Sequence, residues 1–212
     1  MPDYKREGCK MYIEIDPRRP KPRLIARVVE TLKEGGIIAY PTDTFYGIGC
    51  DIFNKHAIEK IYQLKRRPKT KPFSFICSDL TNISQYAQVT NYAYKTMRRL
   101  LPGPYTFVLR GSKLVPKLML TKRKTVGIRV PDHSICLAIV RELGHPVLST
   151  SAATPEGEVL ETPREIEEKL GHAIDIIIDG GIVPCRPSSV ISLIDDEPEV
   201  IREGLGDVSF FL

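Results

Sequence analysis

The fold class is decided by one stretch of the sequence, Gly36-Ile37-Ile38-Ala39-Tyr40-Pro41-Thr42-Asp43-Thr44-Phe45-Tyr46-Gly47. Residues 37–40 form a short apolar run between a glycine pair and Pro41, which predicts a buried strand. Hydroxyl, carboxylate and aromatic groups follow this strand directly, and the ends of strands in α/β sheets usually carry ligand-binding groups. A turn held by Asp43 and the threonine hydroxyls is the alternative that the chemistry of these residues leaves open.

Short strands alternate with amphipathic helices on both sides of this stretch. Apolar periodicity predicts helices over residues 23–34, 55–66, 91–101, 135–143 and 163–170, and strands over residues 9–15, 37–40, 73–77, 105–110, 125–130, 147–151, 174–178, 189–194 and 200–202. Thr162 and Glu165 predict a capping box at the start of the last helix. Because crossover-length helices mix with hairpin-length gaps, we expect a single α/β domain with a twisted mixed β-sheet flanked by helices.

Composition excludes several classes of protein. The chain has 212 residues, of which 42% are hydrophobic and 27% charged, so disordered and fibrous architectures are disfavoured. No apolar run approaches the roughly 18 residues that a membrane span needs, and the first ten residues lack the apolar core of a signal peptide. We therefore expect a cytoplasmic protein without a membrane partner.

Cysteine and histidine usage gives no sign of a disulfide framework or a metal site. The five cysteines form no C-x-x-C pair, and an odd, scattered count favours reduced, packed thiols. No two of the four histidines lie three to five residues apart, so their spacing does not suggest zinc. The sequence predicts no metal site in the protein itself.

Charge is distributed very unevenly along the chain. Residues 1–131 carry 26 Lys and Arg against 10 Asp and Glu, a net charge of +16, whereas residues 132–212 carry 5 against 16, a net charge of −11. A field polarised in this way can steer an anionic partner to one region of the surface. Ordinary solvation of helix faces by lysine and arginine is the alternative, so charge favours a polyanion without identifying one.

Generic nucleotide and hydrolase signatures are absent from the sequence. There is no G-x-x-x-x-G-K-[ST], and the Gly47-Ile48-Gly49 pair lacks the third glycine of the dinucleotide fingerprint. Neither a G-x-S-x-G elbow nor an H-E-x-x-H helix occurs. A P-loop, a Rossmann site and the common hydrolase sites are therefore disfavoured.

A basic segment, Lys65-Arg66-Arg67-Pro68-Lys69-Thr70-Lys71-Pro72, follows the second predicted helix. Cations at this place also complement the negative end of the helix dipole, so a simple helix cap is one explanation. Two prolines, however, stiffen the segment into a defined arch, which suits the capture of phosphate or carboxylate. We favour the second explanation.

Three later stretches are also rich in groups that could bind a ligand. Leu148-Ser149-Thr150-Ser151-Ala152-Ala153-Thr154 ends a strand with small and hydroxylated residues, which let a flat ligand approach the backbone. The stretches Arg186-Pro187-Ser188-Ser189-Val190 and Arg202-Glu203-Gly204 each supply an arginine that could clamp an anion.

Taken in this order, these segments resemble the threonylcarbamoyl-AMP synthase family, also called YrdC-like, and most closely its YciO-like branch. The resemblance covers about residues 20–207 of the single domain predicted over residues 1–212. It also includes Pro102-Gly103-Pro104-Tyr105-Thr106-Phe107, Arg129-Val130-Pro131-Asp132-His133 and Asp179-Gly180-Gly181.

The resemblance implies an enzyme that joins L-threonine, bicarbonate and ATP into threonylcarbamoyl-AMP and releases pyrophosphate, in the pathway of the tRNA modification t6A. It implies Mg²⁺ accompanying the ATP and an electropositive surface that binds double-stranded RNA or tRNA. Carried over to this sequence, the implied site residues are Lys65 and Arg67 as catalytic cations, Thr42, Thr44 and Tyr46 on the threonine side, and Ser149, Ser151, Ser188 and Arg202 on the nucleotide side.

One position departs from the family pattern. The S-x-N element of the family falls on Ser151-Ala152-Ala153, so alanine stands where the family has asparagine. The loss of one carbonyl acceptor and two amide donors in a buried contact is worth about 1–3 kcal/mol. We therefore expect weak or altered synthase activity, and the alternative is a non-catalytic double-stranded RNA-binding module of the same fold.

Overall fold

The computed structural model describes residues 11–71 and 73–211. Its helices are α1 (Pro22–Lys33), α2 (Lys55–Leu64), α3 (Leu80–Tyr86), α4 (Asn91–Leu100), α5 (Ser134–Leu143) and α6 (Pro163–Leu170), with 3₁₀ turns η1 (Lys117–Met119), η2 (Gly171–Ala173), η3 (Ile194–Asp196) and η4 (Ser209–Phe211). The strands are β1 (Met11–Glu14), β2 (Ile38–Tyr40), β3 (Gly47–Asp51), β4 (Ser74–Ile76), β5 (Ala87–Gln88), β6 (Tyr105–Gly111), β7 (Thr125–Arg129), β8 (Val147–Ser151), β9 (Ile176–Asp179), β10 (Ser189–Ser192) and β11 (Glu199–Arg202).

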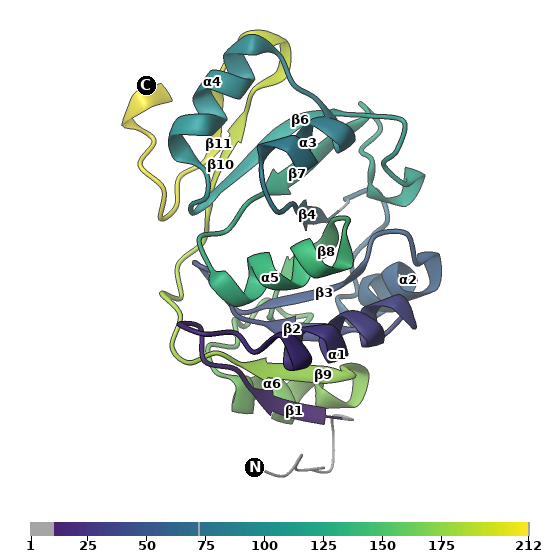
Figure 1. Ribbon diagram of the computed structural model, residues 1–212. Helices are drawn as coiled ribbons and strands as arrows, with labels where there is room; N and C mark the ends of the chain where they lie inside the picture. The colour runs from purple at the N-terminus through teal and green to yellow at the C-terminus, as the bar shows by residue number, and fades with distance from the viewer. Residues whose placement is uncertain (1–10, 72, 212) are drawn as a thin grey trace.

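The strands form one mixed sheet, as the sequence predicts. Their order is β1-β9-β2-β3-β8-β4-β7-β6-β10-β11, with β5 paired to β6 off this path. Parallel pairing joins β9 to both β1 and β2, β4 to β7 and β6 to β10. The sheet twists along the whole length of the molecule, with β1 and β9 at one end and β10 and β11 at the other (Figure 1). The single domain with a twisted mixed sheet flanked by helices is confirmed.

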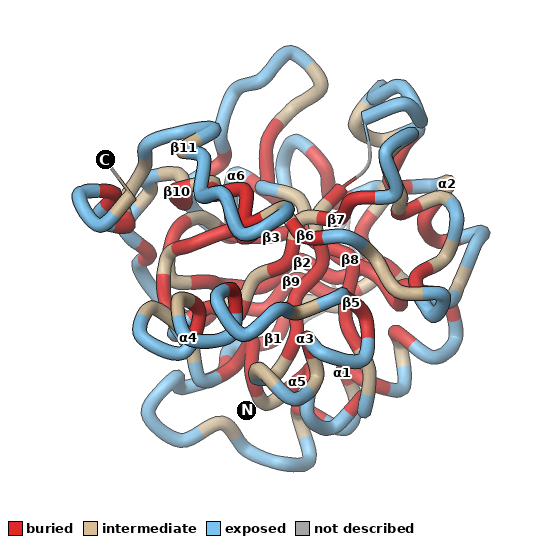
Figure 2. Tube along the Cα trace, turned by 90° about the horizontal axis from the view of Figure 1, so that it is seen from above, coloured by how far each residue is buried: buried red, intermediate tan, exposed pale blue. Residues whose placement is uncertain are grey.

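Two apolar clusters form the core, and the alternation of side chains along the strands separates them. On β2, Ile38 and Tyr40 pack in a cluster with α1 and α5, whereas Ala39 packs in a larger cluster with α2, α3, α4 and α6. Successive side chains of a strand point to opposite faces, so one short apolar run contributes to both clusters. Buried residues accordingly concentrate in the central strands, and most of the connecting loops are exposed, the loop after β2 excepted (Figure 2).

Most predicted elements are present with shifted ends, but β3, α3 and β5 were missed. Residues 47–51 contain two glycines and read as a loop, because glycine is a poor strand former. In the sheet, a Cβ atom at Gly49 would lie 2.4 Å from the Leu148 carbonyl oxygen, so the close approach of β8 requires glycine there. Helix α3 is short and polar, and it begins where Asp79 accepts a hydrogen bond from the Asn82 amide at 2.7 Å.

The described residues also show the capping box, the cysteines and the length of the helices. The capping box of α6 is present, with the Thr162 side chain and the Glu165 side chain each bound to the other's backbone amide. Cys50, Cys77 and Cys136 are buried free thiols and Cys185 is a half-buried one, while Cys9 and the first residues of the strand predicted over residues 9–15 lie outside the described part. Between residues 11 and 211, Pro72 aside, no helix is long and apolar enough to cross a bilayer.

Candidate functional site

A cleft of about 350 Å³ lies across seven neighbouring strands, β3, β8, β4, β7, β6, β10 and β11. On β6, Thr106 and Val108 line the cleft, whereas Phe107 and Leu109 belong to the core. The alternation of the strand therefore gives one apolar face to the core and leaves hydroxyl and small side chains on the other. Among the described residues that line the cleft there are three arginines and no carboxylate: Arg67, Arg129 and Arg202.

Seven of the nine predicted site residues line this cleft. They come from five separate stretches of the sequence, which the sheet brings together: Thr42, Tyr46, Arg67, Ser149, Ser151, Ser188 and Arg202. Thr44 and Lys65 are not among the lining residues. The roles of all nine residues stay predictions, and their positions are described in turn below.

In the loop after β2, the threonine side chains form hydrogen bonds within the protein. The Thr42 hydroxyl donates to the Phe45 carbonyl oxygen at 2.6 Å and accepts from the Thr44 amide at 3.1 Å. Thr44 is fully buried. Its hydroxyl accepts a hydrogen bond from Arg129 Nη2 at 2.9 Å, so Thr44 supports a residue of the cleft wall from behind.

Arg129 is the cleft residue that the sequence interpretation left without a role. Its Nη2 also donates to Asp43 Oδ1 at 2.8 Å, and the two side chains are only 12% and 10% exposed. The second carboxylate oxygen of Asp43 accepts from the Asp132 amide at 3.0 Å. Arg129 Nε is buried and has no hydrogen-bond partner among the described residues. In the sequence, this arginine stands near the end of a predicted strand, two residues before Pro131, in the stretch Arg129-Val130-Pro131-Asp132-His133 that is part of the family resemblance.

Arg202 is held at the opposite wall by Ser188. Its Nη2 donates to the Ser188 carbonyl oxygen at 2.8 Å, and its Nε donates to the same oxygen at 3.2 Å. The Ser188 hydroxyl lies 2.8 Å from the Thr106 hydroxyl. Burial lowers the pKa of Arg202, and the positive charge of Arg129 lowers it further. Two arginines that repel each other across a cleft without carboxylates favour an anionic ligand.

Lys65 and Arg67 lie two residues apart in the basic segment, but their side chains contact different parts of the structure. Arg67 lies with its guanidinium 4.8 Å from the centre of the Phe73 ring and donates from Nε to the Lys71 carbonyl oxygen at 2.7 Å. Lys65 Nζ donates to the Ala153 and Ser151 carbonyl oxygens, at 2.6 and 3.2 Å. Burial, and then the charge of Arg67, lower the pKa of Lys65 to about 8. The ammonium group therefore fastens the basic segment to the end of β8.

Hydroxyl groups fill the floor of the cleft between these cations. Ser149 Oγ accepts a hydrogen bond from the Tyr40 hydroxyl at 2.8 Å, and Ser74 Oγ donates to the Ser149 carbonyl oxygen at 3.2 Å. The Tyr46 ring lines the cleft, but its hydroxyl donates to the Gly181 carbonyl oxygen at 2.7 Å. Burial raises the pKa of Tyr46 to about 12. Tyr46 thus offers the cleft an aromatic surface and keeps its hydroxyl for the loop after β9.

Ala153 lies just outside the cleft. It is 8% exposed, pairs with Val159 in an isolated bridge and is absent from the lining residues. The loop beyond it turns back on itself, because the Thr154 amide donates to the Glu158 carbonyl oxygen at 2.8 Å. This loop is fastened to the basic segment a second time, by Arg66 Nη1 and Glu156 Oε1 at 3.2 Å.

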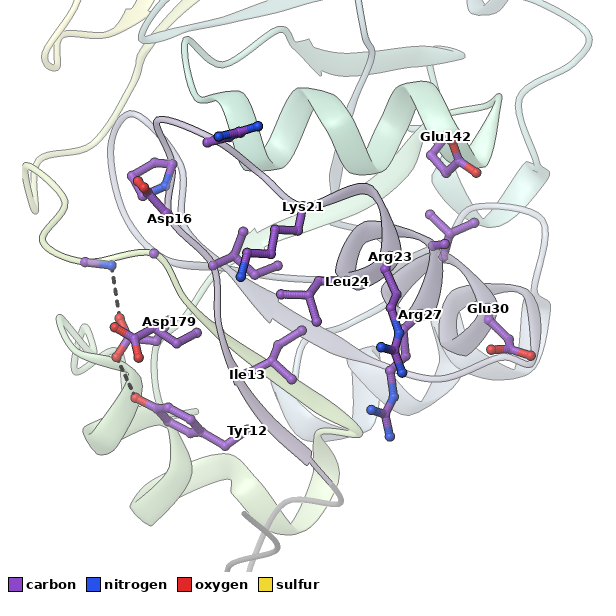
Figure 3. A pocket seen from close by; sticks show the side chains of 18 of the residues that line it. Tyr12, Ile13, Asp16, Lys21, Arg23, Leu24, Arg27, Glu30, Glu142 and Asp179 are labelled. Carbon is purple, nitrogen blue, oxygen red and sulfur yellow. Dashed lines mark hydrogen bonds between the residues drawn. The ribbon is translucent and has the colours of Figure 1, made fainter. Parts of the chain in front are cut away.

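A second and larger cavity, of about 1630 Å³, lies between β1 and α1 and is shown in Figure 3. Basic side chains of α1, including Arg23 and Arg27, share it with acidic ones such as Asp16, Glu30 and Glu142 (Figure 3). Asp179 accepts hydrogen bonds here from the Tyr12 hydroxyl at 2.8 Å and from the Gly181 amide at 3.0 Å. None of the nine predicted site residues lines this cavity, and its mixed charge does not favour an anion.

The described residues offer no metal centre. No group of three or more His, Cys, Asp or Glu side chains could hold a metal ion within residues 11–71 and 73–211. In the cleft, hydroxyls are the side-chain oxygens available, and Mg²⁺ prefers carboxylates or phosphates to neutral hydroxyls. A divalent cation in the cleft would therefore arrive on the phosphates of a nucleotide.

Comparison with known proteins identifies relatives of the whole fold. Residues 30–204 match the Sua5/YciO/YrdC family model, described as telomere recombination. The chain is 44% identical over 203 residues to the uncharacterized protein YciO of Escherichia coli K12, which covers 95% of this chain and 98% of that protein. It is 34% identical over 170 residues to the threonylcarbamoyl-AMP synthase of Vibrio vulnificus, which covers 78% of this chain and 91% of that enzyme.

Solved structures agree with this relationship. The crystal structure of Escherichia coli YciO superposes with a TM-score of 0.90 at 44% identity, and the match covers 95% of this chain and 98% of that one. The structure of P. abyssi Sua5 complexed with L-threonine superposes with a TM-score of 0.85 at 28% identity, and the match covers 91% of this chain and 57% of that one. The fold around the cleft is thus shared with a protein that binds L-threonine.

Proposed function

Because this chain belongs to the Sua5/YciO/YrdC family, we propose that it is a nucleotidyltransferase of the threonylcarbamoyl-AMP synthase type. Its substrates would be L-threonine, bicarbonate and ATP, and its products threonylcarbamoyl-AMP and pyrophosphate, in the cytoplasmic pathway of tRNA t6A modification. The observation that carries the proposal is the convergence of Arg67, Arg129 and Arg202 on a hydroxyl-lined cleft without carboxylates. All three substrates are anions or carry a carboxylate at neutral pH.

Threonine is assigned to the end of the cleft at Arg129. Asp43 and Thr44 occupy its Nη2, which leaves the unpartnered Nε free to donate to an incoming carboxylate. A buried donor without a partner costs about 1–3 kcal/mol, and a ligand carboxylate removes that cost on binding. Thr42 and the Tyr46 ring line the same end and would contact the rest of the amino acid.

The nucleotide is assigned to the remaining wall. Ser149, Ser151 and Ser188 offer hydroxyls that can donate to ribose or phosphate oxygens, and Arg202 is held beside Ser188 by three hydrogen bonds. Arg67 supplies a planar guanidinium for a bidentate contact with phosphate. Two of the three N–H groups of the Lys65 ammonium donate to carbonyl oxygens. Lys65 would bind a phosphate either through its third N–H or after breaking one of these two hydrogen bonds.

The chemistry needs no nucleophile from the protein. The threonine amine adds to bicarbonate and water leaves, which gives a carbamate. An oxygen of this carbamate then attacks the α-phosphorus of ATP, and the bond from that phosphorus to the bridging oxygen breaks to release pyrophosphate. The cleft aligns the two anions, and its cations stabilise the negative charge that develops on the phosphates. Mg²⁺ enters as part of the ATP substrate and supplies further charge stabilisation.

We also propose that the basic part of the chain, residues 1–131, binds double-stranded RNA or tRNA. The support is its net charge of +16, because phosphate contacts by lysine and arginine dominate the affinity of such surfaces. A non-catalytic RNA-binding module is the second candidate function. It is favoured by Ala153 in place of asparagine and by the engagement of Lys65 with two carbonyl oxygens.

A pyrophosphate-release assay with L-threonine, bicarbonate and ATP tests the enzyme directly. We expect release that requires all three substrates and that falls in the Arg129→Lys variant, because lysine keeps the charge but loses the Nε donor. The Lys95→Gln variant, on the exposed face of α4, is the matched control and keeps the wild-type rate. Threonine-independent release, or none at all beside tight RNA binding, would favour the second candidate function.

A further inference from the structure

The turn between η1 and β7, residues 121–125, is a rigid basic corner at the edge of the cleft. The Thr121 and Thr125 hydroxyls lie 2.7 Å apart, and the Thr125 amide donates to Thr121 Oγ1 at 3.0 Å. The Lys124 amide donates to the Thr121 carbonyl oxygen at 2.9 Å, and the Gly111 amide donates to the Lys124 carbonyl oxygen at 2.8 Å. Thr121 and Thr125, the two ends of the turn, line the cleft.

The three residues between these threonines are exposed cations: Lys122, Arg123 and Lys124. Within the described part of the chain, no acidic side chain lies within salt-bridge distance of them. By contrast, Arg66 pairs with Glu156, Lys69 pairs with Glu59 and Arg129 pairs with Asp43. The turn therefore carries a positive charge for which residues 11–71 and 73–211 supply no paired carboxylate.

Lys124 holds a backbone conformation that lysine rarely adopts. Its φ is +58°, in the left-handed region, which costs about 1–2 kcal/mol for a residue with a Cβ atom. Asparagine or glycine would adopt this conformation more readily. Lysine at this position supplies a positive charge, whereas asparagine or glycine would adopt the backbone conformation at lower cost but would supply no charge.

The turn lies at the opposite end of β7 from Arg129. Thr125 and Arg129 are four positions apart in β7, which corresponds to about 13 Å along a strand. The register of β4 with β7 pairs Phe75 with Ile128, and this places Phe73 beside the Thr125 end. Arg67, which lies over the Phe73 ring, is therefore also at the Thr125 end. A carboxylate bound at Arg129 and a phosphate bound near Thr125 would therefore lie at opposite ends of β7.

We propose that the Thr121–Thr125 turn binds the β- and γ-phosphates of ATP, and so holds the pyrophosphate as it leaves. This inference rests on the proposed function and assigns a residue set to the leaving group. With the threonine carboxylate at Arg129, the α-phosphate lies in the middle of the cleft and the outer phosphates extend toward the turn. Lys122, Arg123 and Lys124 contact phosphate oxygens by charge-assisted hydrogen bonds, and Arg67 faces them from the other side.

A compact polyphosphate fits this corner better than a nucleic acid does. Thr121 and Thr125 line the cleft, so a phosphate group held inside the cleft can contact their hydroxyls. One of the two hydroxyls donates to the other, which leaves one hydroxyl proton for a phosphate oxygen. RNA is the competing ligand, and the experiment separates the two.

The test uses calorimetric titration of the full chain at low salt with ATP, AMP and inorganic tripolyphosphate. The variant is Lys122→Gln/Arg123→Gln/Lys124→Asn, in which asparagine tolerates the left-handed backbone. The matched control is Lys95→Gln/Arg98→Gln/Arg99→Gln on α4, which removes the same charge from another exposed surface. Circular dichroism melts check that both variants fold, and Arg123→Gln alone replaces the triple variant if it does not fold.

We expect the turn variant to weaken ATP and tripolyphosphate about tenfold, to change AMP less than twofold, and to match the control in RNA affinity. Equal weakening of ATP and AMP, an equal effect of the α4 control, or a loss confined to RNA would each overturn the assignment. If the wild type binds tripolyphosphate through the turn but not ATP, the turn stands and the proposed function fails. If the wild type binds none of the three, both are overturned.

Discussion

Arg129 Nη2 donates to Asp43 Oδ1 at 2.8 Å, and this pair joins the loop after β2 to the end of β7 beneath the cleft. Asp43 also accepts the Asp132 amide, so one carboxylate fixes both an arginine of the site and the chain that follows it. A hydroxyl, Thr44, completes the shell around Nη2. The orientation of Arg129 is therefore decided by residues that do not line the cleft.

The Asp43→Asn variant should lose both stability and threonine affinity. Removing one partner of a buried ion pair leaves the other charge uncompensated, which costs about 3–5 kcal/mol. Chemical denaturation measures the loss in the free energy of unfolding. The control is Asp195→Asn, because Asp195 pairs with Arg110 at 2.8 Å but both side chains are exposed, where a salt bridge is worth about 0–1 kcal/mol. Equal losses in the two variants would show that the buried pair has no special weight.

Lys65 should make nucleotide binding depend on pH. Its pKa is lowered to about 8 by burial and by Arg67, so the ammonium group loses its proton as pH rises through that value. We expect ATP affinity to fall across this range in the wild type and to stay flat in Lys65→Arg, since arginine remains protonated. Calorimetric titrations between pH about 7 and about 9.5 provide the comparison.

The same shift has a consequence of opposite sign for stability. In the unfolded chain Lys65 keeps its proton up to a pKa of 10.5, so between about 8 and 10.5 the unfolded state binds more protons than the folded state. The free energy of unfolding contributed by this lysine therefore rises with pH over that window. A Lys65→Met variant should lack this rise. A decrease in the wild type relative to Lys65→Met would contradict the assigned pKa direction.

Substitution of the two cations of the basic segment should separate binding from folding. We expect Arg67→Ala to weaken ATP about tenfold or more with little change in melting temperature, because Arg67 is an exposed loop residue that belongs to neither core cluster. Lys65→Ala should cost more stability than Arg67→Ala, since it releases the Ser151 and Ala153 carbonyls. Loss of folding in Arg67→Ala with ATP affinity unchanged would mean that the segment is only a helix cap.

Ala153→Asn tests whether the departure from the family pattern limits activity. One added hydrogen bond is worth about 0.5–1.5 kcal/mol net, so the gain in threonine-dependent pyrophosphate release is at most about tenfold. Because Ala153 is buried and bridges to Val159, we expect the gain to fall below that bound. Calorimetry with ATP on both forms is the control. No gain in rate or affinity, together with wild-type action on threonylcarbamoyl-adenosine or tRNA, would mean a different reaction.

RNA binding should show the salt dependence of phosphate contacts. Each phosphate neutralised on a duplex contributes about −0.9 to the slope of log K against log salt concentration. Filter binding or fluorescence anisotropy with double-stranded RNA or tRNA over a range of salt gives the slope. A salt-insensitive affinity, or no binding at low salt, would remove RNA from the proposed function.

The sequence by itself determined the fold class and most of the elements. Apolar patterning is a local property. It identified α1 and α5 because each buries one side on a core cluster, and it identified β2 because this strand is a continuous apolar run buried on both faces. The capping box of α6 was also readable, since all of its contacts lie within four residues. Strand β3 could not be predicted from the sequence. Its Gly49 is required by the close approach of β8, which lies about a hundred residues away in the chain.

Only the tertiary structure decided how the site is assembled. The sequence supplied the segments that line the cleft, but not that Arg129 would stand among them, because its partners Asp43 and Thr44 are 86 and 85 residues away. Likewise, the ammonium of Lys65 is directed to the end of β8, 86 and 88 residues on. Which donors face a cleft and which are used by the protein itself depends on contacts between strands distant in sequence, and no local pattern encodes these contacts.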